Sequence, residues 1–275
     1  MKKTIALVIS ILLLATVMGG CAKAKDATMD ATEAAAIVSG EAEEAAADVA
    51  EAASGAQNTD DSASAFFGAY MEAKSAVLTK ITDGLANNPD TLMSAMSYLG
   101  ATLSDLYLLP AMYFGLGESS VATALAMMGA KDVKYDEQGN NYTVTYKNSD
   151  ELEAKLVGTY DKGKSLVCVG STAGTENVFS DVYRTSFGYV AQFYALADDG
   201  TATLYQFAIS GADGVIGMSS DASRPAALTG AEAADFPKSA KEWFAISGTT
   251  ITGIDSEGKP VSFEYVPSET DDSNG

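Results

Sequence analysis

The chain of 275 residues contains no histidine and only two cysteines. Without histidine there is no Ser-His-Asp or Cys-His catalytic group, and no histidine-ligated metal. Two cysteines supply neither a disulfide framework nor a cysteine-rich zinc or iron–sulfur site. Several large hydrolase classes and the common transition-metal sites are therefore excluded, and we expect no metal and no cofactor.

Basic residues are also scarce, with 17 lysines and arginines against 37 aspartates and glutamates, for a net charge of −20. This balance excludes nucleic acid as a partner, because binding it requires clustered cations that displace counterions. An acidic surface favours solubility and repels anionic lipid headgroups. Contact with a membrane must then come from something other than surface charge.

Long apolar runs are missing as well. The run from Ile5 to Val17 has about 13 residues, whereas a membrane-spanning helix needs roughly 20. It follows two lysines and leads to two glycines and a cysteine, which is the layout of a secretory signal peptide over residues 1–20.

The segment Val17-Met18-Gly19-Gly20-Cys21 resembles the lipobox of bacterial lipoproteins, although Met18 and Gly19 depart from its usual leucine and its usual serine or alanine. The resemblance implies that Cys21 is lipidated, becomes the mature N-terminus and anchors the chain to the cell membrane on its extracytoplasmic face. Two or more acyl chains, at ~0.8 kcal/mol per buried CH₂, give a stable anchor. Loss of Lys2 and Lys3 with the signal changes the net charge from −20 to −22.

Residues 21–62 are rich in alanine and glutamate and hold almost no large apolar side chain, so we expect a disordered tether. As a flexible coil, some 40 residues span on the order of 35 Å. The chain ends in an acidic tail, residues 268–275.

Apolar residues recur at three- and four-residue spacing through residues 63–130, which predicts helices. Ser62 or Ser64 suits the N-cap of the first helix, and Pro89 suits the first turn of a second helix that Pro110 ends. A third helix is expected after a connector around Gly115 and Gly117.

The period changes to two from residue 131 onward, and glycine-bearing turns separate short strands as far as residue 267. We also expect a helical interruption between Thr229 and Trp243. Helices followed by strands predict an α+β fold over residues 63–267, with N-terminal helices packed on a C-terminal antiparallel β-sheet meander.

Several motifs match a chemistry only in part. Ser256-Glu257-Gly258-Lys259 has the spacing of serine acyl-enzymes without their companion boxes, and Asp136–Asn140 lacks the glycine and final glutamate of a calcium loop. Both favour hairpin turns. Cys168 lies in a short apolar run, which favours a buried and inert thiol.

Carboxylates remain as catalytic groups, because a pair of them hydrolyses glycosidic bonds without histidine. Their spacing singles out no pair, and most occupy turns or solvated faces. The candidates are Asp198, Asp199, Glu232, Asp235, Glu242 and Glu264.

Aromatic side chains crowd two adjacent predicted strands, and polar glutamines stand among them. One face of these strands is expected to pack under the helices, and the other either lines a groove for a lipid, peptide or glycan or is itself covered. The candidate ligand-binding residues are Tyr189, Gln192, Phe193, Tyr205, Gln206 and Phe207.

These features favour a membrane-anchored, non-enzymatic binding or interaction domain with an apolar or glycan ligand. Its partners would be the membrane, through the N-terminal lipid, and an unknown ligand or envelope protein. The architecture is similar to that of the envelope's lipoprotein carriers, an analogy at the level of fold only. Two alternatives stay open: a carboxylate-dependent glycan hydrolase and a structural component of an envelope complex.

Overall fold

The computed structural model describes residues 61–267. Lipidation of Cys21, the acidic tail and nearly all of the tether lie outside this range. The α-helices come first: α3 (Ala63–Ala86), α4 (Leu92–Leu103) and α5 (Glu118–Met127). Short 3₁₀ segments join or follow them: η1 (Pro89–Thr91), η2 (Ser104–Tyr113) and η3 (Phe236–Ser239).

Eleven strands follow the helices and form one sheet in chain order, each antiparallel to its neighbours. The strands are β1 (Lys131–Gln138), β2 (Asn141–Lys147), β3 (Glu153–Asp161), β4 (Ser165–Thr172), β5 (Thr175–Arg184), β6 (Tyr189–Leu196), β7 (Ala202–Ser210), β8 (Asp213–Ser220), β9 (Glu242–Ser247), β10 (Thr250–Ile254) and β11 (Pro260–Glu264). The described chain is thus α+β, with its helices N-terminal to an antiparallel sheet.

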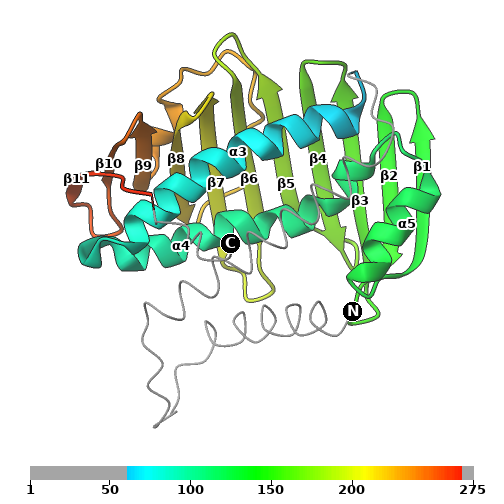
Figure 1. Ribbon diagram of the computed structural model, residues 1–275. Helices are drawn as coiled ribbons and strands as arrows, with labels where there is room; N and C mark the ends of the chain where they lie inside the picture. The colour runs from blue at the N-terminus through cyan, green and yellow to red at the C-terminus, as the bar shows by residue number, and fades with distance from the viewer. Residues whose placement is uncertain (1–60, 268–275) are drawn as a thin grey trace, which may run out of the picture. The chain divides into compact units, whose positions relative to one another are not determined.

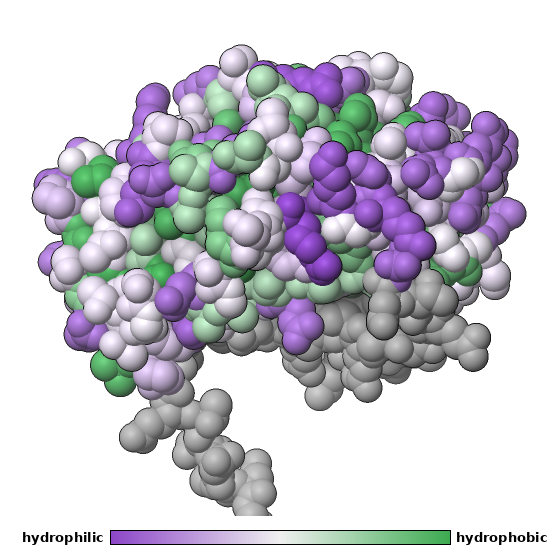
Figure 2. Space-filling model, turned by 90° about the horizontal axis from the view of Figure 1, so that it is seen from above, coloured by the Kyte–Doolittle hydropathy of each residue, from purple (hydrophilic) through white to green (hydrophobic). Residues whose placement is uncertain are grey.

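The helices lie on one side of the sheet, where α3 crosses the strands diagonally (Figure 1). One large apolar cluster joins them to the facing side chains of the strands. Seen from above, hydrophilic residues are spread over the surface and apolar residues reach it in smaller areas between them (Figure 2). No helix within residues 61–267 is both long and apolar enough to cross a bilayer.

The first helix forms as its periodicity predicts. The Ser62 hydroxyl accepts a hydrogen bond from the Ala65 N–H at 3.1 Å, which caps one of the unpaired donors of the first turn. Phe66, Val77 and Ile81 are buried on the face that meets the sheet.

One predicted helix boundary and one predicted helical segment are wrong. Pro110 does not end the second helix, because the α-helix already ends at Leu103 and the chain continues as the 3₁₀ segment η2, with Pro110 inside it. Between Thr229 and Trp243 the chain is mostly irregular, with only the short η3 before β9 begins at Glu242. The bonds of Glu232 to Thr229 and Gly230, and the close approach of Pro237 to Gly217, hold it in this irregular form despite the helix propensity of its alanines.

A buried ion pair joins α3 to η2. The Lys74 ammonium contacts the Asp105 carboxylate, donates to the Ala101 carbonyl at 2.8 Å and lies 4.9 Å from the centre of the Phe207 ring. The side chain of Lys74 is 3% exposed and that of Asp105 is 19% exposed. Burial raises the pKa of Asp105, and the charge and hydrogen bond of Lys74 oppose that rise.

Replacing Lys74 with methionine should lower the free energy of unfolding by about 3 kcal/mol, because it leaves the Asp105 carboxylate largely buried without its cation. The control is Lys80→Met on the same helix, whose amine makes an exposed hydrogen bond to Ala212 and should matter by about 0.5 kcal/mol or less. Urea unfolding measures both. Equal losses in the two variants would contradict the assignment, and Asp105→Leu added to Lys74→Met should restore part of the stability.

Candidate ligand-binding site

The pleat of the sheet divides the predicted ligand-binding residues between its two faces. In the pairing of β6 with β7, Phe193 lies opposite Tyr205, and Gln192 lies opposite Gln206. Because successive side chains of a strand point to opposite faces, these two pairs are on different sides of the sheet. The structure therefore does not bring the predicted residues together in one place.

Four of the predicted residues form the floor on which the helices pack. The Tyr205 hydroxyl donates to the Ser97 carbonyl of α4 at 3.0 Å, and Phe207 is fully buried. Tyr189 makes ring contacts with two aromatic residues of α3, and Phe193 makes one with Tyr107 of η2. On this face, core packing accounts for the aromatic crowding.

The other face of the central strands is covered by the segment Asp221–Lys241, here called the strap. It leaves β8 and reaches β5, where Arg224 pairs with Glu176 and lies 4.5 Å from the centre of the Phe179 ring. It then returns toward β9. Gly217 marks its return path, since a Cβ there would lie 2.3 Å from the Pro237 carbonyl oxygen.

Polar side chains of the sheet hold the middle of the strap. Gln192 donates to the Ala226 carbonyl at 2.7 Å, and the Leu228 N–H donates to Asp181 Oδ2 at 2.7 Å. Gln192 also donates to Asp181 Oδ2 at 3.3 Å. The Leu228 side chain enters a small apolar cluster with Val190, Ala208 and nearby aromatic residues.

Asp181 is the functional candidate that sequence reasoning missed. It is completely buried, and its Oδ1 has no hydrogen-bond partner among the described residues. Burial raises its pKa to about 6; the bonds from Leu228 and Gln192 oppose this rise, and the charge of Glu232 adds to it. The sequence feature that could have identified Asp181 is its position in β5, where the alternation of side chains puts it on the same apolar face as Phe179 and Tyr183.

A groove of about 350 Å³ lies between the strap and this face of the sheet. Small apolar side chains contribute to its floor, and charged groups from the strap and a hairpin turn stand among its walls. Its lining residues are Phe187, Ala208, Ser210, Asp213, Gly214, Val215, Ala234, Asp235, Lys238, Ala245, Ile246 and Ser247. The volume falls within the range typical of small-ligand sites.

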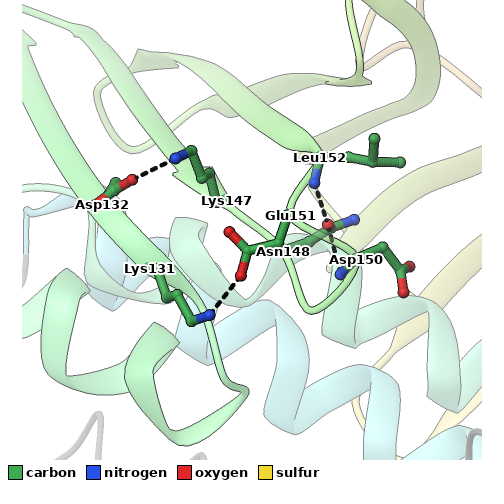
Figure 3. A network of polar contacts seen from close by, with 7 residues as sticks. All are labelled: Lys131, Asp132, Lys147, Asn148, Asp150, Glu151 and Leu152. Atoms are coloured by element: carbon green, nitrogen blue, oxygen red, sulfur yellow. Dashed lines mark hydrogen bonds and ion pairs between the residues drawn. The ribbon is translucent and has the colours of Figure 1, made fainter.

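A wider hollow of about 530 Å³ lies along the outer strands β1 to β3. Charged side chains surround this corner, where Lys147 pairs with Asp132 and Lys131 pairs with Glu151 (Figure 3). The Asn148 side chain accepts hydrogen bonds from two main-chain N–H groups of its own turn. All four paired side chains are exposed, so solvent screens both pairs and the corner is a hydrated edge.

Three of the six predicted catalytic carboxylates accept hydrogen bonds from nearby threonine or glycine residues. Glu232 accepts hydrogen bonds from Thr229 and Gly230, Asp199 accepts from Thr201, and Glu264 accepts from Thr249 and Thr250. Asp198 is exposed in the β6–β7 turn. Of the six candidates, only Asp235 lines the groove.

Glu242 is buried on the opposite face, against the helices. Its strand position pairs with Met218, beside Tyr205. Burial raises the pKa of Glu242; the Ser94 hydroxyl opposes this rise and the charge of Asp255 adds to it. Among the described residues, neither carboxylate oxygen has a partner of normal hydrogen-bond geometry. Glu242 therefore lies away from the groove.

The remaining sequence expectations concern turns and the thiol. Asp136–Asn140 spans the end of β1 and a tight hairpin into β2, and Ser256–Lys259 forms the β10–β11 turn. Cys168 is buried, which raises its pKa to about 12 and keeps it protonated. Within residues 61–267, no three side chains of the metal-binding types lie together.

Comparison with known protein families, with curated proteins and with solved structures found no match. The function is therefore inferred from the sequence and the geometry of this chain alone.

The raised pKa of Asp181 predicts an unusual pH dependence of stability. The folded-state pKa is about 6 and the ordinary value is 3.8, so the stabilising contribution of the protonated group is present below about pH 4 and is lost as the pH rises through about 6. Asp181→Asn removes this loss. Relative to the wild type, the variant should gain roughly 2 to 3 kcal/mol between pH 4 and pH 7 in urea unfolding.

Asp199→Asn is the control, because hydrogen bonds from Thr201 lower the pKa of Asp199 and its contribution is lost as the pH falls. A relative stability of Asp181→Asn that stays constant between pH 4 and pH 7 would contradict the assignment.

Proposed function

We propose that this protein is a lipid-anchored, non-enzymatic binding module of the extracytoplasmic face of the cell membrane. Its ligand lies in the groove between the strap and the sheet. The groove is the observation that carries the proposal: it combines an apolar floor, a small number of polar groups and a volume of about 350 Å³.

The anchoring part of the proposal rests on the lipobox-like segment that ends at Cys21. A tether of some 40 residues separates that cysteine from α3. The mature chain, of net charge −22 after loss of Lys2 and Lys3, is repelled by anionic headgroups, so the acyl chains supply the membrane affinity. The binding site then works at a distance from the bilayer that the tether sets.

The chemistry of the groove supports binding rather than catalysis. Val215, Ala245 and Ala208 offer contact area without any reactive group, and Lys238 lies 5.0 Å from the centre of the Trp243 ring. An apolar ligand would be held by burial of its surface, at roughly 25 cal/mol per Å².

One observation favours the glycan hydrolase as a second candidate. Asp213 and Asp235 both line the groove, as the two carboxyl groups of a glycosidase must line one cleft. Asp213 Oδ1 accepts a hydrogen bond from the Gly248 N–H at 2.9 Å. Turnover of a glycan by the wild type that Asp235→Asn abolishes would support this candidate against simple binding.

Another observation favours a structural role in an envelope complex. Residues 91–117 hold a single charged side chain, that of Asp105, which is paired with Lys74. Met93 is 74% exposed and Tyr107 is 56% exposed on this segment. Recovery of a cross-linked partner through position 93, but not through an exposed position of β11, would support this candidate.

Filling the groove should remove ligand binding. The mature chain with Cys21→Ser keeps every residue of the folded part and has no lipid, so it can be titrated with Nile red, a neutral apolar dye. Ala245→Trp puts a large side chain into the groove and should weaken dye binding at least fivefold. Ser262→Trp adds the same side chain on β11, outside the groove, and should leave binding unchanged.

Native mass spectrometry of the same protein shows whether an expression host supplies a ligand. A bound mass that leaves on denaturation and is absent from Ala245→Trp would identify the ligand class. Nile red binding that is equal in the two tryptophan variants would refute the groove as the site.

Lipidation of Cys21 has a direct test. In a bacterial host given labelled palmitate, the full chain should take up label and sediment with membranes, whereas Cys21→Ser should do neither. Cys168→Ser is the matched control and should behave as the wild type, because its thiol is buried. Label retained by Cys21→Ser would contradict the lipobox assignment.

A further inference from the structure

The strap meets the sheet in the manner of a bound peptide. The main-chain carbonyl of Ala226 and the main-chain N–H of Leu228 form hydrogen bonds with side chains of the sheet. The Leu228 side chain packs into the small apolar cluster with Val190 and Ala208. Two residues before Ala226, Arg224 makes an ion pair with Glu176 and a ring contact with Phe179. These are the elements by which an extended peptide is recognised: main-chain bonds for affinity, and side-chain pockets for specificity.

The strap has little structure of its own to hold it in place. Its first part, Asp221–Glu232, makes no main-chain hydrogen bond to another main-chain group within residues 61–267. A segment of 21 residues that contains only the four-residue η3 is long for a connection within a domain, and such segments are commonly lids or binding loops. Its position therefore depends on contacts that another peptide can also make.

The surface beneath the strap keeps an unused polar group. Asp181 Oδ1 is buried and has no partner among the described residues, although Oδ2 of the same carboxylate accepts two hydrogen bonds. A buried acceptor left unpaired is costly. A ligand with one more N–H donor than the strap offers would satisfy it.

We infer that Arg224–Leu228 is an internal pseudo-ligand, and that the face beneath it is a site for an extended peptide with a basic residue four positions before an aliphatic one. This inference goes beyond the proposed function, because neither Arg224–Leu228 nor the side chains of Asp181 and Gln192 line the groove. Because strap and sheet belong to one chain, the strap competes at a high effective concentration. An external peptide binds when it is tighter than the strap or when the strap is released.

The test uses the mature chain with Cys21→Ser and a fluorescent, end-capped peptide copied from Ser223–Gly230. Leu228→Asp in the protein releases the strap, because its side chain can no longer enter the apolar pocket. Fluorescence anisotropy should show that the peptide binds this variant at least tenfold more tightly than it binds the protein with an unchanged strap. Ala227→Asp is the control, since Ala227 is exposed, and should bind the peptide as weakly as the wild type.

Peptide variants test which contacts carry recognition. Leu228→Asp and Arg224→Glu in the peptide should each weaken binding to the released protein at least tenfold, and Ala227→Ser should not. Gln192→Ala, added to Leu228→Asp in the protein, should also weaken binding. Arg224→Ala in the protein, at an exposed position, releases one end of the strap and should tighten peptide binding about threefold even if Leu228→Asp fails to fold.

Equal peptide affinity in Leu228→Asp and Ala227→Asp, or no effect of Leu228→Asp in the peptide, would overturn the inference. If Nile red still binds in that case and Ala245→Trp still blocks it, the proposed function survives and only the pseudo-ligand is rejected. If both probes fail to bind, the groove as a ligand site and the pseudo-ligand are both rejected.

Discussion

The constraint on which this structure depends is that an open sheet of eleven strands has two faces, and both are apolar over its central strands. Side chains alternate between the faces, so a strand such as β6, apolar in both registers, needs cover on both sides. The N-terminal helices lie on one side only (Figure 1). Covering the other side falls to the strap, and the groove lies along the strap where that cover is incomplete.

An open sheet also has two edges, which present unpaired main-chain groups. The outer strand β1 carries alternating charges, among them Lys131, Asp132 and Lys134, and the outer strand β11 begins with Pro260. Charge and proline on edge strands oppose pairing with other chains. Protection of this edge accounts for the ion pairs at the β1–β3 corner. For that reason we place the ligand in the smaller groove beneath the strap and not in the hollow at the corner.

The parts of the fold that were predicted correctly are those decided by local pattern. The face of α3 and the alternation of β2 are visible in the sequence because each depends on spacing within one element. Residues between Thr229 and Trp243 were wrongly expected to form a helix, because Gly230–Ala234 has little strand character. The strap that contains most of them is held by Asp181, which lies 47 residues before Leu228, and contacts at that distance leave no local pattern.

For the same reason, only part of the candidate site could be predicted from the sequence. Gln192 and Gln206 stood out as polar residues in apolar strands, and they do lie on the face that the helices leave free. The aromatic residues grouped with them point to the helices, since neighbouring positions of one strand face opposite ways. Pairing Asp181 with Gln192 required the register of β5 on β6, which follows from the whole meander rather than from either strand.

The choice of residue beneath the strap says something about what the strap is for. An aliphatic side chain at position 181 would hold Leu228 by contact alone and would avoid the cost of a buried carboxylate. Asp181 instead orients one main-chain N–H and positions Gln192, which orients one carbonyl. These bonds select a direction and a register for the chain above them. A permanent cover needs no such selection, whereas a surface that recognises a peptide main chain does.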